Sequence, residues 1–233
     1  MNSFKFLLWI SIFSYFIYST VQTKEYANKS IAPFDAIISL GGNCQIAFQL
    51  NINGLRHYSL PFDYWITPFM SLYNLLENKF VHFLDKENFI FSPPNETSSS
   101  WVVDSLYGVI MIHDFKLDVD FLKDYEMVRA KFERRIDRFY TVLSKSNYVL
   151  FIRNWITKDE AIALDELLGR LFPHLSYRLV VLSSSEESFS TDWGFDRIKN
   201  FYLRQPVPYV ALGDNQAWKE IFINCGLTID ARK

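Results

Sequence analysis

The residues best suited to chemistry are a cysteine, Cys44, and a histidine, His113, which lie far apart in the sequence. A thiolate can attack an acyl carbon when a histidine within hydrogen-bond reach takes the thiol proton. Cys44 follows the apolar run 36–40 and two glycines, and His113 follows the apolar run 106–112. If both runs are strands of one open α/β sheet, both residues lie at its carboxyl edge, where ligands bind. We therefore predict a Cys–His pair for nucleophilic acyl transfer.

Sequence signals around Cys44 are typical of a strand that turns directly into a helix. Gly41 and Gly42 end the run 36–40, because glycine adopts backbone angles that other residues avoid. Asn43 is a good helix N-cap, and apolar residues at helical spacing follow it. Helix N-termini favour anions, so this position should lower the thiol pKa, and local N–H groups with the Asn43 side chain should form an oxyanion hole. The alternative is that Cys44 is a small apolar residue that packs the turn.

Two acidic residues are candidates for orienting the imidazole. Asp114 adjoins His113, but neighbouring residues of a strand point to opposite faces. Asp63, in an aromatic segment rich in proline, is therefore the rival third member of the catalytic group.

Three basic residues are candidates for binding the substrate. His57 is also the rival base, and Arg56 beside it could bind an anion. Arg153 ends another apolar run, where it could bind a carboxylate or phosphate, or cap local structure.

The composition excludes several classes of function. The chain has 233 residues, of which 49% are hydrophobic, enough for one domain with a large core. The net charge of −2, with both signs interspersed, gives no surface for nucleic acid. Cys44 and Cys225 are the two cysteines, and they form no zinc pattern, although a disulfide between them would remove the reactive thiol. We find no P-loop, dinucleotide or HExxH motif and expect no cofactor and no metal.

The N-terminal segment has the pattern of a targeting sequence. Lys5 is followed by 18 residues without charge, most of them apolar, before Lys24. Residues 1–23 are therefore predicted to be a signal peptide or a signal anchor in the membrane, residues 24–33 a polar lead-in, and residues 34–233 a single α/β domain. The protein is accordingly expected to be secreted or extracytoplasmic, or membrane-anchored through this segment.

Strand-type and helix-type segments alternate after residue 34. This alternation predicts an α/β fold, with a largely parallel sheet flanked by helices in a Rossmann-like, three-layer arrangement. The charged residues of the helix 124–143 are expected to face solvent, and the stretch 92–100 to form a surface loop or lid. The expected strands are residues 36–40, 106–112, 148–153, 177–182 and 199–203. The expected helices are the segment after Asn43, residues 69–83, 124–143 and 216–224, and a helix from the capping box 157–160 to Pro173.

Several ordered blocks of the sequence resemble the DUF1796 family, which is named for papain-like cysteine peptidases. The resemblance runs from about residue 34 to 182 and implies that Cys44 is the nucleophile and His113 the base. The papain-like name implies a histidine on an antiparallel barrel, whereas the periodicity predicts βαβ units. The matching blocks are Ser39-Leu40-Gly41-x-Asn43-Cys44-x-x-Ala47-x-x-Leu50, Gly54-Leu55-Arg56, Pro61-Phe62-Asp63-Tyr64, His113-Asp114-Phe115, Lys131-Phe132-x-Arg134-Arg135-x-x-Arg138-Phe139 and Phe151-Ile152-Arg153.

Three functions remain open from the sequence. The first is a cysteine-dependent hydrolase, peptidase-like, acting on a peptide or acyl-type substrate. The second is an α/β transferase in which Arg56, Asp63 and Arg153 hold an anionic or nucleotide-sugar ligand in the same crevice. The third is a non-catalytic exported binding domain that uses the aromatic segment 58–69 as its contact surface.

Overall fold

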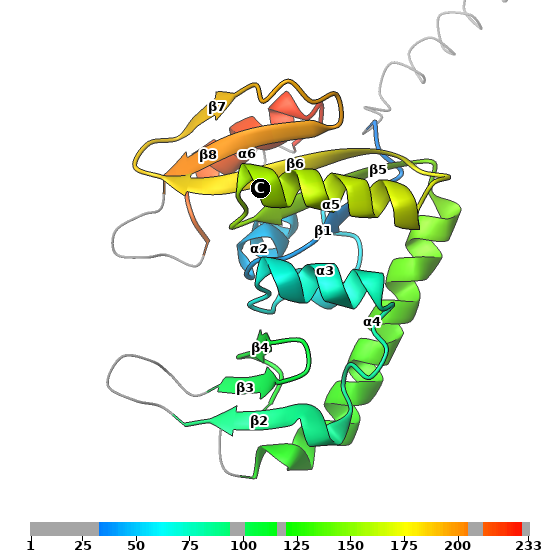
Figure 1. The fold of residues 1–233 in the computed structure, drawn as a ribbon. Helices are drawn as coiled ribbons and strands as arrows, with labels where there is room; N and C mark the ends of the chain where they lie inside the picture. The colour runs from blue at the N-terminus through cyan, green and yellow to red at the C-terminus, as the bar shows by residue number, and fades with distance from the viewer. Residues whose placement is uncertain (1–32, 94–100, 116–119, 205–211, 230–233) are drawn as a thin grey trace, which may run out of the picture. The chain divides into compact units, whose positions relative to one another are not determined.

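A five-stranded sheet, sheet A, forms the centre of the fold in the computed structural model, which describes residues 33–93, 101–115, 120–204 and 212–229 (Figure 1). The strand order is β1-β5-β6-β8-β7, and only the pairing of β7 with β8 at one edge is antiparallel. The predicted α/β fold with a largely parallel sheet is confirmed, and the described strands close into no barrel. The strands are β1 (Ala36–Ser39), β5 (Tyr148–Asn154), β6 (Ser176–Ser185), β7 (Phe189–Thr191) and β8 (Ile198–Arg204).

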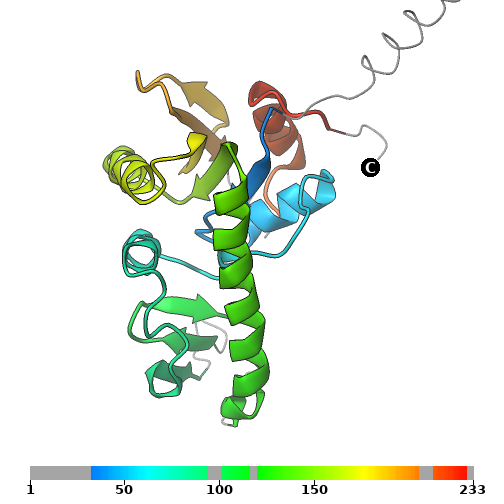
Figure 2. The same cartoon turned by 90° about the vertical axis from the view of Figure 1, so that its right-hand side faces the viewer.

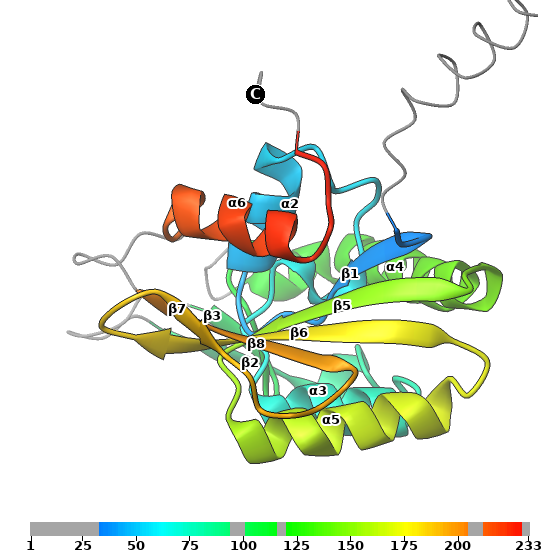
Figure 3. The same cartoon turned by 90° about the horizontal axis from the view of Figure 1, so that it is seen from above.

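Helices lie on both faces of sheet A, and its central strands β5 and β6 are accordingly apolar on both sides. Successive residues of β5 alternate between two cores: Val149 and Phe151 belong to one, Leu150 and Ile152 to the other. Figure 3 shows α2 and α6 on one face and α3 and α5 on the other. The helices are α2 (Gln45–Ile52), α3 (Phe69–Glu77), α4 (Tyr125–Lys145), α5 (Lys158–Leu171) and α6 (Asn215–Asn224).

The helix α4 packs along the core that includes Val149 and Phe151. At about 1.5 Å per residue its 21 residues span about 30 Å, and Figure 2 shows it running from sheet A to the smaller sheet below. Its buried stripe includes Val128, Phe132, Phe139 and Leu143, as the helical spacing predicts. The capping box that opens α5 is also confirmed, because Thr157 Oγ1 accepts a hydrogen bond from the Glu160 N–H.

A second sheet, sheet B, is the main feature that the sequence did not predict. It has the antiparallel order β2-β3-β4, with β2 (Phe89–Ser92), β3 (Trp101–Asp104) and β4 (Val109–Met111). The run 106–112 was expected to be a strand of the parallel sheet, and this expectation is wrong. An apolar run marks a buried strand but does not identify its neighbours, and here the neighbour is the local strand β3.

The helix expected over residues 69–83 ends at Glu77. The chain then turns through four residues with positive φ, namely Lys79 (51°), Phe80 (59°), His82 (59°) and Leu84 (71°). The rings of Phe80 and Phe83 continue the apolar spacing but pack against each other and the core from this turn. The apolar spacing therefore continues past the end of the helix, which is why the predicted helix was too long.

Some expectations concern residues that lie outside the described part of the chain. These are the N-terminal leader and lead-in up to residue 32, and most of the loop 92–100. Among the helices in the described ranges, none has the length and apolar character needed to span a bilayer.

Candidate active site

Cys44 lies in the turn that connects β1 to α2, directly before the first residue of the helix, and it is half-buried. It occupies the N-cap position of α2, one residue after the N-cap predicted at Asn43. Cys225, which follows α6, is buried, and both cysteines are free. The disulfide between Cys44 and Cys225 that would have removed the reactive thiol is therefore not formed.

The turn before Cys44 requires glycine at two positions. Gly41 and Gly42 have φ of +74° and +106°, in the region that side chains disfavour. A Cβ on Gly42 would lie 1.9 Å from Asn154 Oδ1 and 2.6 Å from the Asn154 carbonyl oxygen. The end of β5 is thus packed directly against the Gly42 backbone, which fixes the path of the chain into Cys44.

Replacing Gly42 with alanine should therefore destabilise the protein. Left-handed strain and a clash with backbone that cannot move away together predict a loss of about 2–4 kcal/mol in the free energy of unfolding. Gly194→Ala is the matched control, because Gly194 has φ of +80° but no atom within 4 Å of the place that a Cβ would take. Urea denaturation of both variants separates the cost of left-handed backbone strain, which both variants carry, from the cost of the clash at Gly42. Equal losses in the free energy of unfolding would contradict the close packing at Gly42.

Asn43 and Asn154 form a buried amide pair behind Cys44. Asn43 Oδ1 accepts hydrogen bonds from the Gln45 N–H at 3.0 Å and from Asn154 Nδ2 at 2.7 Å. The Asn154 N–H donates to the Gly41 carbonyl at 3.2 Å, whereas Asn154 Oδ1 has no donor among the described residues although Asn154 is only 3% exposed. Because the Gln45 N–H already has an acceptor, it does not contribute to the expected oxyanion hole in this conformation.

Burial raises the pKa of the Cys44 thiol, and its own backbone N–H lowers it by less. The predicted lowering of this pKa by the helix N-terminus is thus wrong for this conformation. Desolvation disfavours the charged thiolate, and in this half-buried position it outweighs the hydrogen bond from the Cys44 backbone N–H. At neutral pH the residue is a thiol, so its use as a nucleophile requires a base.

His113 is exposed on a bend that follows β4 of sheet B, so it does not lie at the edge of the parallel sheet. A short segment nevertheless connects its surroundings to the Cys44 turn. Thr67 donates its N–H to the Gly42 carbonyl at 3.1 Å, and the adjacent Ile66 pairs with Ile110 of β4. The backbones of Gly42 and Ile110 are thus joined through residues 66 and 67, while His113 lies three residues beyond Ile110. In this conformation no hydrogen bond joins the Cys44 thiol to the imidazole.

The rival base, His57, and its neighbour Arg56 follow the opposite end of α2. Cys44 caps the start of this eight-residue helix, which is about 12 Å long. His57 is exposed, and the centroid of its ring lies 6.4 Å from that of Tyr58. The Arg56 guanidinium lies over the ring of Tyr64, which packs against Phe48 of α2.

Both acidic candidates are engaged by cations. Asp63 is buried, forms an ion pair with Arg56 at 2.7 Å and accepts a hydrogen bond from the Leu60 N–H. Asp114 forms an ion pair with Lys131 at 2.6 Å. Burial raises the pKa of Asp63, although Arg56 opposes this.

The cationic partners on α4 were not recognised from the sequence. Lys131 is an exception to the expectation that the charged face of α4 is solvated, because its side chain is 28% exposed and bound to Asp114. Arg135 is also partly buried, lies over the Phe132 ring and interacts electrostatically with both Asp63 and Asp114. A polar residue at helical spacing gives no sign of a partner 17 or more positions away.

Arg153 supports the backbone of the site. It is fully buried, and its guanidinium donates to the Leu40 carbonyl at 2.9 Å and the Thr67 carbonyl at 2.6 Å. Burial lowers its pKa to about 10. Of the two roles open to Arg153 from the sequence, these contacts match the capping of local structure, because they join the end of β1 to the segment that pairs with β4.

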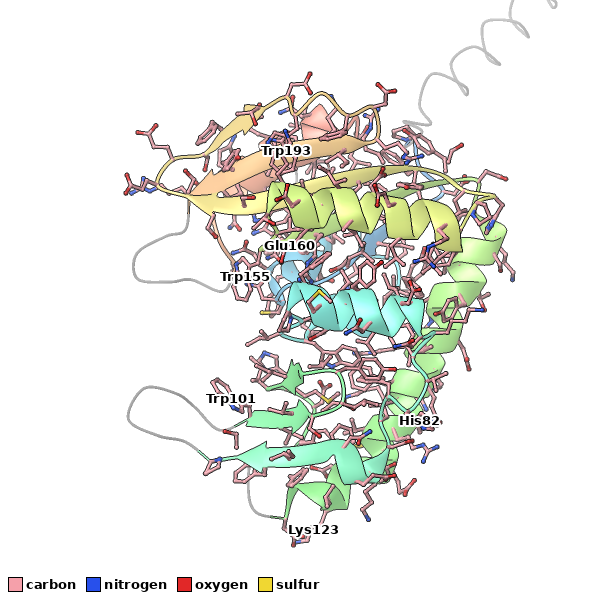
Figure 4. All side chains as sticks on the ribbon, in the orientation of Figure 1. His82, Trp101, Lys123, Trp155, Glu160 and Trp193 are labelled. Carbon is pink, nitrogen blue, oxygen red and sulfur yellow. The ribbon has the colours of Figure 1, made fainter. Side chains whose placement is uncertain are left out.

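Trp155, directly after β5, is a residue that sequence reasoning missed. It has φ of +54°, which costs a bulky residue about 1–3 kcal/mol. Its neighbours hold it there: Asn154 is bonded to Asn43, and the Ile156 carbonyl accepts the Ser183 hydroxyl at 2.7 Å. The side chain remains 41% exposed, and Figure 4 shows it below the start of α5 at the carboxyl edge of sheet A.

The comparisons with known proteins identify one family and one relative. Residues 35–185 match the family described as "Putative papain-like cysteine peptidase (DUF1796)", a range that includes Cys44, His113 and Trp155. The chain is also 27% identical over 220 residues to "Uncharacterized protein R408" of Acanthamoeba polyphaga mimivirus, covering 80% of this chain and 96% of that protein. No solved structure matches significantly. Within the described ranges, no group of three or more His, Cys, Asp and Glu side chains could hold a metal ion.

Proposed function

Because the chain belongs to the DUF1796 family, we propose that it is a cysteine-dependent hydrolase that acts on a peptide or other acyl bond, with Cys44 as the nucleophile. The observation that carries this proposal is a free, half-buried thiol at the junction of a parallel strand and a helix, inside the range that matches the family. Such a junction at the carboxyl edge of an α/β sheet is the usual place for a ligand.

The reaction would proceed through an acyl-enzyme. A base takes the Cys44 proton, the thiolate attacks the carbonyl carbon, and the leaving amine departs with a proton returned by the same base. Water then hydrolyses the thioester and regenerates the thiol. Because burial raises the thiol pKa, little thiolate forms spontaneously at neutral pH, and the base is essential to the first step.

His113 is our proposed base. Its support is the connection through Ile66 and Thr67, which joins the turn before Cys44 to the strand β4 that precedes His113. Catalytic hydrogen bonds are often long or absent without substrate, so the bend after β4 would bring the imidazole into reach on binding. Asp114, held by Lys131 and by Trp65 Nε1 at 3.2 Å, would anchor that bend.

His113→Ala should lower hydrolysis by a factor of about 10²–10⁴, the usual contribution of a general base. Alkylation of Cys44 by iodoacetamide in this variant should keep increasing with pH beyond the range in which an ordinary cysteine ionises, because burial raises the pKa of the unassisted thiol. The measurement is the pH profile of the hydrolysis rate and of the Cys44 alkylation rate, in the wild type and in the variant.

His57→Ala is the matched control, since His57 is also an exposed histidine in a connecting segment. It should leave both profiles unchanged. Equal losses in the two variants, or a loss in His57→Ala alone, would contradict the assignment of His113 as the base.

The two other functions considered from the sequence have less support. The transferase needs Arg56, Asp63 and Arg153 to hold an anion, but Arg56 is bonded to Asp63, and Arg153 donates to two backbone carbonyls. The binding domain needs exposed rings in the segment 58–69, but Phe62 and Trp65 are fully buried.

A further inference from the structure

Trp155 is a large apolar residue at a position where neither backbone nor packing favours it. Its positive φ is one that glycine adopts freely, and the indole is 41% exposed. A fold that needed only the turn would be satisfied by a small residue here. The neighbouring Asn154 Oδ1 also lacks a hydrogen-bond donor among the described residues, so this junction leaves an apolar and a polar group without a partner there.

The chain that carries Trp155 is also held to the chain that carries the candidate nucleophile. Asn43 and Asn154 are joined at 2.7 Å, Cys44 follows the first of them, and Trp155 follows the second. The two side chains that could act on a ligand are thus each one residue from the same hydrogen bond. Figure 4 shows Trp155 projecting at the edge of the molecule and not into the core.

We propose that Trp155 is a substrate-contacting residue that binds an aromatic or large aliphatic group next to the bond attacked by Cys44. This inference rests on the proposed function and names its substrate class. An exposed indole gains most from apolar and aromatic partners, by burial of area and by ring stacking. An anionic group is not favoured there, because the adjacent cation, Arg153, is fully buried and donates to the Leu40 and Thr67 carbonyls.

The test measures how fast Cys44 reacts with small electrophiles that share one reactive group but carry different tails. The protein is reacted separately with iodoacetamide and with its N-benzyl, N-isobutyl and N-carboxymethyl derivatives. Each rate is divided by the rate of the same reagent with glutathione, which corrects for differences in intrinsic reactivity. Peptide mass spectrometry assigns the modification to Cys44. We expect the benzyl and isobutyl reagents to react about tenfold or more faster than iodoacetamide on this scale.

Trp155→Gly should abolish this preference while changing the iodoacetamide rate less than about twofold, because only the tail contacts the ring. Trp155→Phe should keep most of the preference for the benzyl and isobutyl reagents. Trp155→Asn repeats the test if the glycine variant does not fold, because asparagine also tolerates a positive φ. Phe189→Ala is the matched control, an exposed ring on β7 at the far edge of sheet A from β1.

An unchanged preference in both Trp155→Gly and Trp155→Asn, a wild-type protein without preference, or a preference for the carboxymethyl tail would overturn the inference. These outcomes are independent of turnover, since alkylation needs the Cys44 thiolate but no hydrolysis of a substrate. A protein that hydrolyses peptides through Cys44 but shows no tail preference would keep the proposed function and lose the role of Trp155. A protein that shows the tail preference but does not hydrolyse peptides would keep the role of Trp155 and lose the proposed function.

Discussion

Replacing Cys44 with alanine is expected to lower hydrolysis by a factor of about 10⁴ or more, because the covalent route is lost entirely. The thiol is only half-buried and its replacement removes a single atom, so the free energy of unfolding should change by less than about 1 kcal/mol. The measurement is cleavage of a defined peptide mixture followed by mass spectrometry, with circular dichroism to confirm folding.

Cys225→Ala is the matched control for this experiment. Cys225 is 4% exposed and packs in the core at the end of α6, and burial raises its pKa to about 11. Its replacement should cost some stability but leave activity intact below the melting temperature. Unchanged turnover in Cys44→Ala would refute the nucleophile, whatever the control does.

Replacing Arg153 with alanine is expected to lower the free energy of unfolding by about 3–5 kcal/mol. The variant leaves the buried Leu40 and Thr67 carbonyls without their donor and opens a cavity in the core. For a domain of this size the melting temperature should fall by about 6–20 °C. Calorimetry of the purified protein measures it.

Two further variants separate the causes of that loss. Arg153→Met fills most of the volume and removes the cost of burying a cation, so it should lose less than Arg153→Ala. Arg178→Ala is the matched control, an arginine of the neighbouring strand β6 that is half-exposed, and it should stay within about 0.5 kcal/mol of the wild type. If Arg153→Ala were no less stable than Arg178→Ala, the bridging role of Arg153 would be wrong.

The parallel sheet could be predicted because its information is local. Strands such as β5 are continuous apolar runs, and helices such as α4 and α5 are indicated by apolar spacing or by a capping box. Sheet B could not be assigned in the same way. Its strands are three or four residues long, and its members pair with each other and not with sheet A.

The candidate site was only partly predictable, because its contacts join distant parts of the chain. The turn at Cys44 follows from its glycines, but the Asn43–Asn154 hydrogen bond spans 111 positions and the Arg153–Leu40 contact 113. Burial of the thiol, which reverses the predicted pKa change, is likewise a property of the packed structure. Nothing in the sequence Asn154-Trp155-Ile156 indicates a left-handed backbone at its centre.

The most direct test of the central claim is to look for the acyl group on Cys44. The protein is mixed with p-nitrophenyl acetate, quenched in acid within the first turnovers and analysed by intact and peptide mass spectrometry. We predict one acetyl group per chain as a thioester on Cys44, released by hydroxylamine and absent from Cys44→Ala. Hydrolysis without this adduct, or an acetyl group on another residue at the same rate in both proteins, would contradict the account.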